Sequence, residues 1–151
     1  MNAELSIVHL DELPPDRLAG LVTESEEAGF AFVRRLVDEW VSGVNRFAGP
    51  GEVLFAAVVD GRIVGVCGLN VDPYLAAGRV GRVRHLYVAA EVRRRGVGTR
   101  LAATVVATAR ESFDRLRLRT ESASAARFYE ALGFRPCVEE VACTHVLELA
   151  S

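Results

Sequence analysis

Three strand-like runs follow one another in the middle of the sequence, and their order restricts the fold more than any other feature. Residues 53–59 and 63–69 are apolar and β-branched, and Asp60-Gly61 joins them. Asp-Gly between two such runs is the strongest short signal for a β-hairpin. A third run, residues 80–88, comes next with no helical pattern in between. This succession excludes a repeating β-α-β chain and predicts a mixed sheet.

Helical and strand-like patterns on either side of these runs complete one domain. The further predicted elements are a strand at 5–10, helices at 15–28 and 30–44, a helix at 99–111, a strand at 116–120, a helix at 123–132, and strands at 134–138 and 143–149. The predicted order is β-α-α-β-β-β-α-β-α-β-β, with residues 1–151 as a single domain. The predicted fold class is α/β (α+β), a mixed, mostly antiparallel sheet of six to seven strands with helices on both faces.

The composition excludes several kinds of protein. Apolar residues make up 50% of the 151 residues and charged residues 25%, which is the composition of a globular protein. All 18 basic residues are Arg, so no Lys nucleophile or Schiff base is available. We see no signal-peptide pattern at the N-terminus and no apolar run that could span a membrane. We therefore expect a cytoplasmic protein with no membrane partner.

The three cysteines, Cys67, Cys137 and Cys143, all lie in apolar runs. Their number is odd and their spacing fits no zinc motif, so we expect no metal site. Free cysteines in such runs behave as small hydrophobic residues, and a reducing compartment is the simplest explanation for them.

The net charge of −2 hides an uneven distribution along the chain. Residues 61–135 contain 14 Arg and 6 acidic residues, which gives a net charge of +8, whereas residues 1–60 have a net charge of −7. Asymmetry of this kind predicts an anion-binding site in the basic segment.

A basic turn with two glycines, Arg93-Arg94-Arg95-Gly96-Val97-Gly98-Thr99, joins the strand at 80–88 to the helix at 99–111. Glycine lets the backbone approach a ligand closely, and successive N–H groups at the start of a helix form a cradle for an anion. Three adjacent arginines add attraction for a polyanion. The spacing is neither that of a Walker A loop nor that of the Rossmann fingerprint. The alternative is a solvated arginine run beside a glycine-rich turn.

A second block, residues 126–134, reads Ala-Arg-Phe-Tyr-Glu-Ala-Leu-Gly-Phe. The turn at 93–98 matches the pattern Gln/Arg-x-x-Gly-x-Gly/Ala, and Leu86-Tyr87-Val88 precedes it. Together these segments resemble the conserved blocks of the GNAT superfamily of N-acetyltransferases. The two blocks at this separation are much more specific than either alone. The resemblance implies acetyl-CoA as co-substrate, no metal, and a sheet in which two central strands splay apart.

By this resemblance, the backbone amides of the turn bind the pyrophosphate of acetyl-CoA, and the pantetheine arm pairs with the exposed edge of the strand at 80–88. A strand edge offers unpaired N–H and C=O groups to such an extended amide chain. Tyr129 matches the tyrosine that protonates the departing thiolate, and the N–H of Val88 stabilises the oxyanion. The implied cofactor-binding residues are Leu86, Tyr87, Val88, Arg93, Arg94, Arg95, Gly96, Val97, Gly98, Thr99, Ser122 and Tyr129.

Two of these positions have a structural alternative. Ser122 stands where the family often has an Asn that contacts CoA. Because Ser has a shorter reach, it or Ser124 can instead cap the helix at 123–132. Tyr129 taken alone would be a core aromatic residue of an amphipathic helix, but the Phe-Tyr-Glu-x-Leu-Gly-Phe context favours the catalytic role.

The strand at 80–88 offers no obvious catalytic base. Alternation along a strand places Leu86, Arg84 and Arg82 on the same side as Val88, and Arg cannot be deprotonated in a protein. His85 points to the other side unless a bulge re-aims it; otherwise it is a half-buried strand histidine. The remaining candidates are a chain of water molecules or the carboxylates of the early helices, Glu26, Glu27, Asp38 and Glu39.

Arg82 and Arg84 predict a clamp for a carboxylate or phosphate on the acceptor, such as the carboxylate of an amino acid. The alternatives are an ion pair with Asp or Glu, or solvent exposure at the start of the strand. The acidic segment 1–60 supplies the helices expected to border the acceptor cleft, where an amine would enter. The other residues considered for the acceptor side, besides His85, are Trp40, Asp72, Tyr74 and Glu27.

The favoured interpretation is acetyl transfer from acetyl-CoA to the primary amine of a small molecule, by direct attack in a ternary complex. One alternative is acetylation of a peptide or protein N-terminus. Another is a non-catalytic sensor of acyl-CoA, because the obvious base is missing. Nucleic-acid binding ranks last, because the arginine run is short and lacks interleaved aromatic residues. A homodimer through the late strands at 134–149 stays open.

Overall fold

The computed structural model describes residues 4–75 and 79–149. The helices and strands follow one another in the predicted order. No helix within the described ranges is long and apolar enough to cross a membrane. The elements are β1 (Leu5–His9), α1 (Pro15–Glu27), α2 (Phe32–Ser42), β2 (Val53–Val59), β3 (Arg62–Val71), β4 (Val80–Val88), the 3-10 helix η1 (Ala90–Val92), α3 (Val97–Ala109), β5 (Arg115–Leu118), α4 (Ala123–Ala131), β6 (Arg135–Pro136) and β7 (His145–Glu148).

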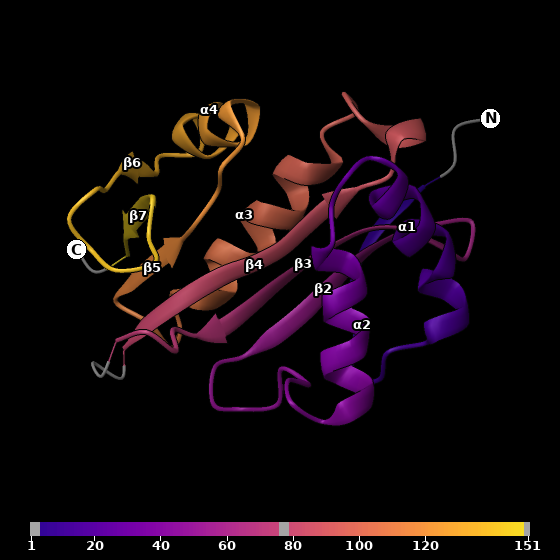
Figure 1. Ribbon diagram of the computed structural model, residues 1–151, viewed down its shortest axis with the longest axis horizontal. Coiled ribbons are helices and arrows are strands. Elements are labelled where there is room, and N and C mark those ends of the chain that lie inside the picture. Colours follow the sequence, from indigo (N-terminus) through magenta and orange to yellow (C-terminus); the bar gives the residue numbers. More distant parts are fainter. Residues whose placement is uncertain (1–3, 76–78, 150–151) are drawn as a thin grey trace.

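The strands form one seven-stranded sheet in the order β1-β2-β3-β4-β5-β7-β6. Neighbouring strands are antiparallel except β4 and β5, which run parallel. The parallel pairing ends at Arg82 and Arg117, after which β4 continues to Val88 while β5 stops at Leu118. Figure 1 shows the two central strands diverging at this point. The predicted mixed sheet with a splayed central pair is therefore confirmed.

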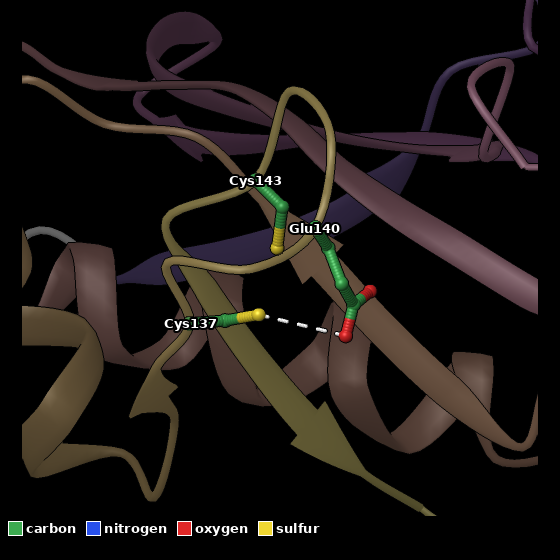
Figure 2. Close-up of side chains that lie close together, drawn as sticks. All are labelled: Cys137, Glu140 and Cys143. Atoms are coloured by element: carbon green, nitrogen blue, oxygen red, sulfur yellow. Dashed lines mark hydrogen bonds between the residues drawn. The ribbon is translucent and has the colours of Figure 1, made fainter.

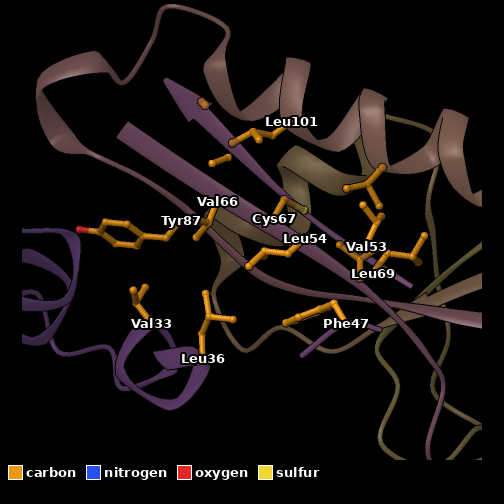
Figure 3. Close-up of a cluster of buried hydrophobic side chains, with 14 of the residues drawn as sticks. Val33, Leu36, Phe47, Val53, Leu54, Val66, Cys67, Leu69, Tyr87 and Leu101 are labelled. Carbon is orange, nitrogen blue, oxygen red and sulfur yellow. The ribbon is translucent and has the colours of Figure 1, made fainter. Parts of the chain in front are cut away.

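Helices cover both faces of the sheet, as predicted. Figure 3 shows Val33 and Leu36 of α2 on one side of the strands and Leu101 of α3 on the other. All three side chains are buried. Burial of each large aliphatic side chain contributes about 1.5–3 kcal/mol, so these two layers fix the position of β4 between them.

Three local features follow directly from the sequence. Asp60 and Gly61 have φ values of 51° and 75°, the left-handed conformation that the tight turn between β2 and β3 requires. Pro15 opens α1, where its missing N–H would have no partner in any case. Gly133 follows the end of α4 with a φ of 104°, a conformation that side-chain-bearing residues avoid at a helix end.

Several element boundaries differ from the prediction, and two of them have a clear local cause. Helix α3 begins at Val97 rather than at residue 99, because Gly96 adopts the left-handed conformation that ends the preceding turn. Strand β6 contains only Arg135–Pro136 rather than residues 134–138, since Pro136 has no N–H to continue the ladder. This short strand forms one edge of the sheet, and Val138 beyond it is 94% exposed. A homodimer through this edge stays a prediction.

Strand β4 contains a bulge. Val66 of β3 lies opposite Tyr87, and Gly68 lies opposite Arg84, so β4 has one residue more than β3 over this stretch. His85 in the bulge has a φ of 62°, which is uncommon for a residue with a side chain. The extra residue breaks the strict alternation of side chains along the strand. A side chain before the bulge therefore lies on the other face of the sheet from the one that simple alternation, counted from residues after the bulge, predicts.

Candidate active site

A cleft of about 1130 Å³ opens where β4 and β5 separate. Its walls come from the connection between α1 and α2, from β4, from the turn before α3, from the end of β5 and from α4. A second hollow of about 620 Å³, between α1 and the β2–β3 turn, contains neither of the two sequence blocks. The predicted site residues that line the main cleft are Tyr74, Arg82, Arg84, His85, Leu86, Tyr87, Val88, Arg93, Arg94, Gly96, Val97, Gly98, Thr99, Ser122 and Tyr129.

The glycine-rich turn presents the start of α3 to this cleft. Gly96 precedes the helix with a φ of 76°, and no side chain caps the first turn. Within the described residues, the N–H groups of Val97, Gly98 and Thr99 have no hydrogen-bond acceptor. A Cβ on Gly98 would only touch Phe128 and Val88, at 3.6 Å. The helix start therefore offers free N–H groups and a positive dipole end, which suit a bound anion.

The open edge of β4 ends at Val88. The N–H of the next residue, Ala89, donates to the Val64 carbonyl of β3, with an N–O distance of 2.8 Å. Because successive residues of a strand turn their polar groups to opposite edges, the N–H and C=O of Val88 point away from β3 and into the cleft. Arg93 occupies that carbonyl, since its Nε donates to Val88 O at 3.0 Å.

The side chain of Tyr87 is held on the other side of β4, against α1. Its hydroxyl donates to the carboxylate of Glu24 and accepts from Arg93 at 3.2 Å. The N–H of Ala90 also donates to Glu24, at 3.1 Å. Burial and the neighbouring Glu24 carboxylate raise the pKa of Tyr87 to about 12. Glu24 thus fixes the end of β4 to α1, and nothing in the sequence distinguished it from the other carboxylates of that helix.

Tyr129 projects from α4 into a small aromatic cluster. Its ring centroid lies 5.2 Å from that of Phe128 and 5.5 Å from that of Phe134. Burial, with a smaller contribution from Cys67, raises the pKa of the phenol above its ordinary value. The hydroxyl therefore keeps its proton at neutral pH. It has no hydrogen-bond partner in the part of the chain that the structure describes, which leaves it able to donate to a ligand.

Ser122 caps α4. Its Oγ accepts from the N–H of Ala125 at 3.2 Å and lies 3.0 Å from the Oγ of Ser124. This is the capping role that the sequence left open. The side chain also lines the cleft, but one of its acceptor lone pairs is already used within the helix start.

The bulge places Arg84 and Arg82 on the opposite face of the sheet from Val88. The Val88 side chain lies toward α3, 3.6 Å from the position of a Cβ on Gly98. Arg84 pairs with Gly68, whose Cβ position would fall 2.5 Å from Phe47 under α2. The expectation that both arginines share the side of Val88 was wrong, because it assumed uninterrupted alternation.

His85 lies buried in the wall of the cleft. The residue is 8% exposed, its ring meets Phe47 edge-on at 6.2 Å, and neither ring nitrogen has a hydrogen-bond partner among the described residues. Burial, with smaller contributions from the charges of Arg84 and Arg35, lowers its pKa to about 3. The Phe32 backbone opposes this lowering without reaching hydrogen-bond geometry. His85 is therefore a neutral imidazole, more deeply buried than the half-buried strand histidine that the sequence offered as one alternative.

A family model described as "Acetyltransferase (GNAT) family" matches residues 16–134 of this chain. The chain belongs to the GNAT family of acetyltransferases. Members of this family are acyltransferases, and acetyl-CoA is their general acyl donor. The sequence resemblance is thereby confirmed.

Solved structures agree with this assignment. A protein from Exiguobacterium sp. 255-15 assigned to the acetyltransferases is 29% identical, with a TM-score of 0.85 over 96% of this chain and 93% of its own. An acetyltransferase from Trypanosoma brucei is 26% identical, with a TM-score of 0.69 over 91% and 97% of the two chains. A GNAT acetyltransferase from Staphylococcus aureus Mu50 is 19% identical and shares the fold, with a TM-score of 0.77 over 97% and 99%.

In this GNAT chain, Arg82 forms part of a buried ion-pair network. Its NH1 lies 3.4 Å from Asp72 Oδ2, and NH1 of Arg117 lies 3.3 Å from Asp72 Oδ1. The Asp72 and Arg117 side chains are fully buried, and the guanidinium of Arg82 sits 4.8 Å from the centre of the Tyr74 ring. For Arg82, the ion-pair alternative therefore describes the structure. Asp72 is an internal counter-ion and does not line the cleft.

Three other predicted residues lie away from the cleft wall. Trp40 stacks on Phe47 at 6.3 Å, behind the surface of the cleft. Glu27 is exposed at the end of α1, and Arg95 is exposed on the outside of the turn. Helix α2 and the residues before it contribute Phe30, Phe32 and Arg35 instead. Sequence reasoning missed these three residues, because a helix pattern alone does not say which turn faces a site.

The charge of the cleft corrects the expected role of the acidic segment. Among the described residues that line it, six are arginines and one, Glu121, is acidic. Glu121 is paired with Arg119 at 3.1 Å. The segment 1–60, acidic in total, supplies an arginine and two phenylalanines to the cleft but no carboxylate. The cleft as a whole is therefore cationic, on the acceptor side as well as at the glycine-rich turn.

Cys137, Glu140 and Cys143 lie together in the β6–β7 loop, as Figure 2 shows, and their ligand atoms are within 4.8 Å of one another. The Cys137 thiol donates to Glu140 Oε2 at 3.5 Å. The carboxylate of Glu140 also pairs with Arg115 and, at 3.3 Å, with Arg117. Two guanidinium groups on the central carboxylate oppose a bound cation, so the arrangement is explained as part of the ion-pair network.

Proposed function

We propose that this protein transfers the acetyl group of acetyl-CoA to the primary amine of a small molecule, by direct attack in a ternary complex. The observation that carries the proposal is the convergence of three features on one cleft. These are the open edge of β4 at Val88, the unsatisfied helix start at 97–99 and the protonated hydroxyl of Tyr129. Together they match the parts that acyl transfer from a CoA thioester requires.

The chemical groups of acetyl-CoA fit the groups that line the cleft. Free N–H groups at the start of α3 suit the pyrophosphate, and the exposed side chains of Arg93 and Arg94 add positive charge beside it. The edge of β4 offers its polar backbone groups to the amides of pantetheine. Arg93 must release the Val88 carbonyl before that oxygen can accept from pantetheine, because the guanidinium occupies it.

The chemical step follows from the positions of Val88 and Tyr129. A neutral amine attacks the thioester carbonyl, and the Val88 N–H donates to the oxygen as it becomes negative. The C–N bond forms, the C–S bond breaks, and the Tyr129 hydroxyl gives its proton to the leaving sulfur. Because its pKa is raised, the hydroxyl is still protonated when the thiolate forms. The phenol then takes up a proton from water.

The proton of the amine leaves to solvent rather than to a side chain on β4. His85 is buried and neutral, with both ring nitrogens closed off from water, and Arg82 and Arg84 cannot accept a proton. The arginines of the cleft favour the neutral form of an amine bound beside them, because like charges disfavour the ammonium. This supports an enzyme that selects amines already deprotonated.

Isothermal titration with acetyl-CoA, followed by thiol release over a panel of amines, tests the proposal. We expect binding and turnover, with a product heavier than the amine by one acetyl group. Tyr129→Phe should lower kcat much more than it changes the KM for acetyl-CoA, and Arg127→Gln, at an exposed position of the same helix, provides a control. Binding of acetyl-CoA without turnover of any amine would favour the acyl-CoA sensor, and absence of binding would refute both.

A further inference from the structure

The acceptor side of the cleft holds two arginines for which the proposed reaction has no use. Arg84 lies on β4 beside the bulge and Arg35 on α2, and both line the cleft. Neither has an acidic partner within residues 4–75 and 79–149. Guanidinium groups lining a site usually find a carboxylate, as Arg82 does with Asp72. The N–H groups of Arg84 and Arg35 are therefore available to donate hydrogen bonds to a ligand.

The two side chains come from different elements and line the same cleft. The buried His85 ring is near enough to both for their positive charges to lower its pKa. Phe30 and Phe32, on the connection between α1 and α2 and at the start of α2, also line this cleft, and Tyr74 lines it from the loop after β3. Phe30 and Tyr74 are exposed. The result is a cationic patch with aromatic walls.

Binding of the acetyl donor, acetyl-CoA, does not account for this patch. Acetyl-CoA has its negative charge on the phosphate groups, which the helix start at 97–99 with Arg93 and Arg94 accommodates. Arg84 and Arg35 instead lie on the α2 side of β4, across the strand from α3. An acceptor whose only charge is an ammonium would be repelled there. A negative group on the acceptor removes that conflict.

We propose that the acceptor is a small amine that also carries a carboxylate or phosphate, and that Arg84 and Arg35 bind this anionic group. The inference rests on the proposed acetyltransferase function. Arginine holds carboxylates and phosphates through paired N–H donors, and two such residues fix the orientation of the molecule as well as its charge. The anionic group offsets the charge of the two guanidiniums, so the amine can lie beside them without net repulsion.

Matched pairs of amines test this directly. L-Phenylalanine and L-phenylalaninamide differ in the carboxylate, and O-phosphoethanolamine and ethanolamine differ in the phosphate. We expect kcat/KM to be at least about tenfold higher for the anionic member of one pair or both, because each charge-assisted hydrogen bond contributes strongly. The pair that shows the preference identifies which anion the patch takes.

Arg84→Gln and Arg35→Gln should each raise the KM for the anionic amine about tenfold, with little change in the KM for acetyl-CoA or for the neutral amine. Arg127→Gln, on the exposed side of α4, removes the same charge elsewhere and should leave all three values unchanged. Arg35 is exposed, so its variant keeps the test valid should replacement of half-buried Arg84 disturb folding.

The outcomes separate the two claims. Turnover of amines with no preference for the anionic member of either pair overturns the inference and leaves the acetyltransferase function standing. A preference that survives both arginine variants also overturns it. Failure to bind acetyl-CoA, or binding without turnover of any amine, refutes the proposed function itself, and the anionic acceptor falls with it.

Discussion

The buried His85 predicts a specific dependence of stability on pH. Its pKa in the folded protein is lowered to about 3, whereas the pKa of a histidine in an unfolded chain is about 6.5. As pH falls below the unfolded value, the unfolded chain takes up a proton that the folded chain refuses. The free energy of unfolding therefore decreases progressively from that point down to about pH 3. Between pH 8 and pH 5, this difference in proton binding lowers the free energy of unfolding by ~2 kcal/mol.

His85→Asn is the variant that isolates this effect. Asn does not titrate in this range and, like His, tolerates the left-handed backbone conformation found at the bulge. Urea unfolding at pH 8, 7, 6 and 5, followed by the fluorescence of Trp40, the single tryptophan, gives the free energy of unfolding of both proteins. The wild-type value minus that of the variant should fall by ~2 kcal/mol between pH 8 and pH 5.

His9→Asn is the matched control. His9 is exposed and lies 3.7 Å from an exposed Asp11 carboxylate. Its replacement should leave the pH dependence of stability close to that of the wild type over the same range. Parallel curves for wild type and His85→Asn would refute the reasoning. They would mean that the ring reaches water or gains a partner when it is protonated.

Three further substitutions test other parts of the structure. Ser122→Ala removes the cap of α4 and should cost about 1 kcal/mol of stability, without weakening acetyl-CoA binding in a titration; a large loss of affinity would assign the hydroxyl to the ligand. Gly96→Ala forces a side chain into a φ of 76°; it should cost about 1–2 kcal/mol in chemical unfolding and weaken acetyl-CoA binding. Asp72→Asn leaves the buried guanidiniums of Arg82 and Arg117 without their shared carboxylate. It should cost about 3–5 kcal/mol, and unchanged stability would contradict the network.

Local sequence signals predicted much of the fold. The β2–β3 hairpin follows from Asp60-Gly61, and α1 begins where Pro15 allows it to. The glycine-rich turn predicted a helix start that can cradle an anion, and the structure places that start in the cleft. In each case the deciding interaction lies within a few residues along the chain, which is why sequence patterns report it.

The acceptor side depended on pairings that the sequence does not show. Strand alternation predicts the side of a residue only for an uninterrupted ladder, and β4 gains a residue relative to β3 at His85. Arg82 and Arg84 therefore looked equivalent, but only Arg82 has a buried carboxylate partner, 10 residues away along the chain. Arg35 reaches the same patch from a helix far away in sequence. Charge summed over a segment was misleading for the same reason, because exposed carboxylates of α1 and α2 face away from the cleft.

A crystal structure with bound acetyl-CoA tests the central claim most directly. The account predicts the pyrophosphate on the N–H groups of residues 97–99 and pantetheine along β4, with Arg93 released from the Val88 carbonyl. It also predicts the thioester oxygen about 2.7–3.1 Å from the Val88 nitrogen and the sulfur within reach of the Tyr129 hydroxyl. Acetyl-CoA bound in the hollow between α1 and the β2–β3 turn, or a thioester remote from Val88 and Tyr129, would contradict it.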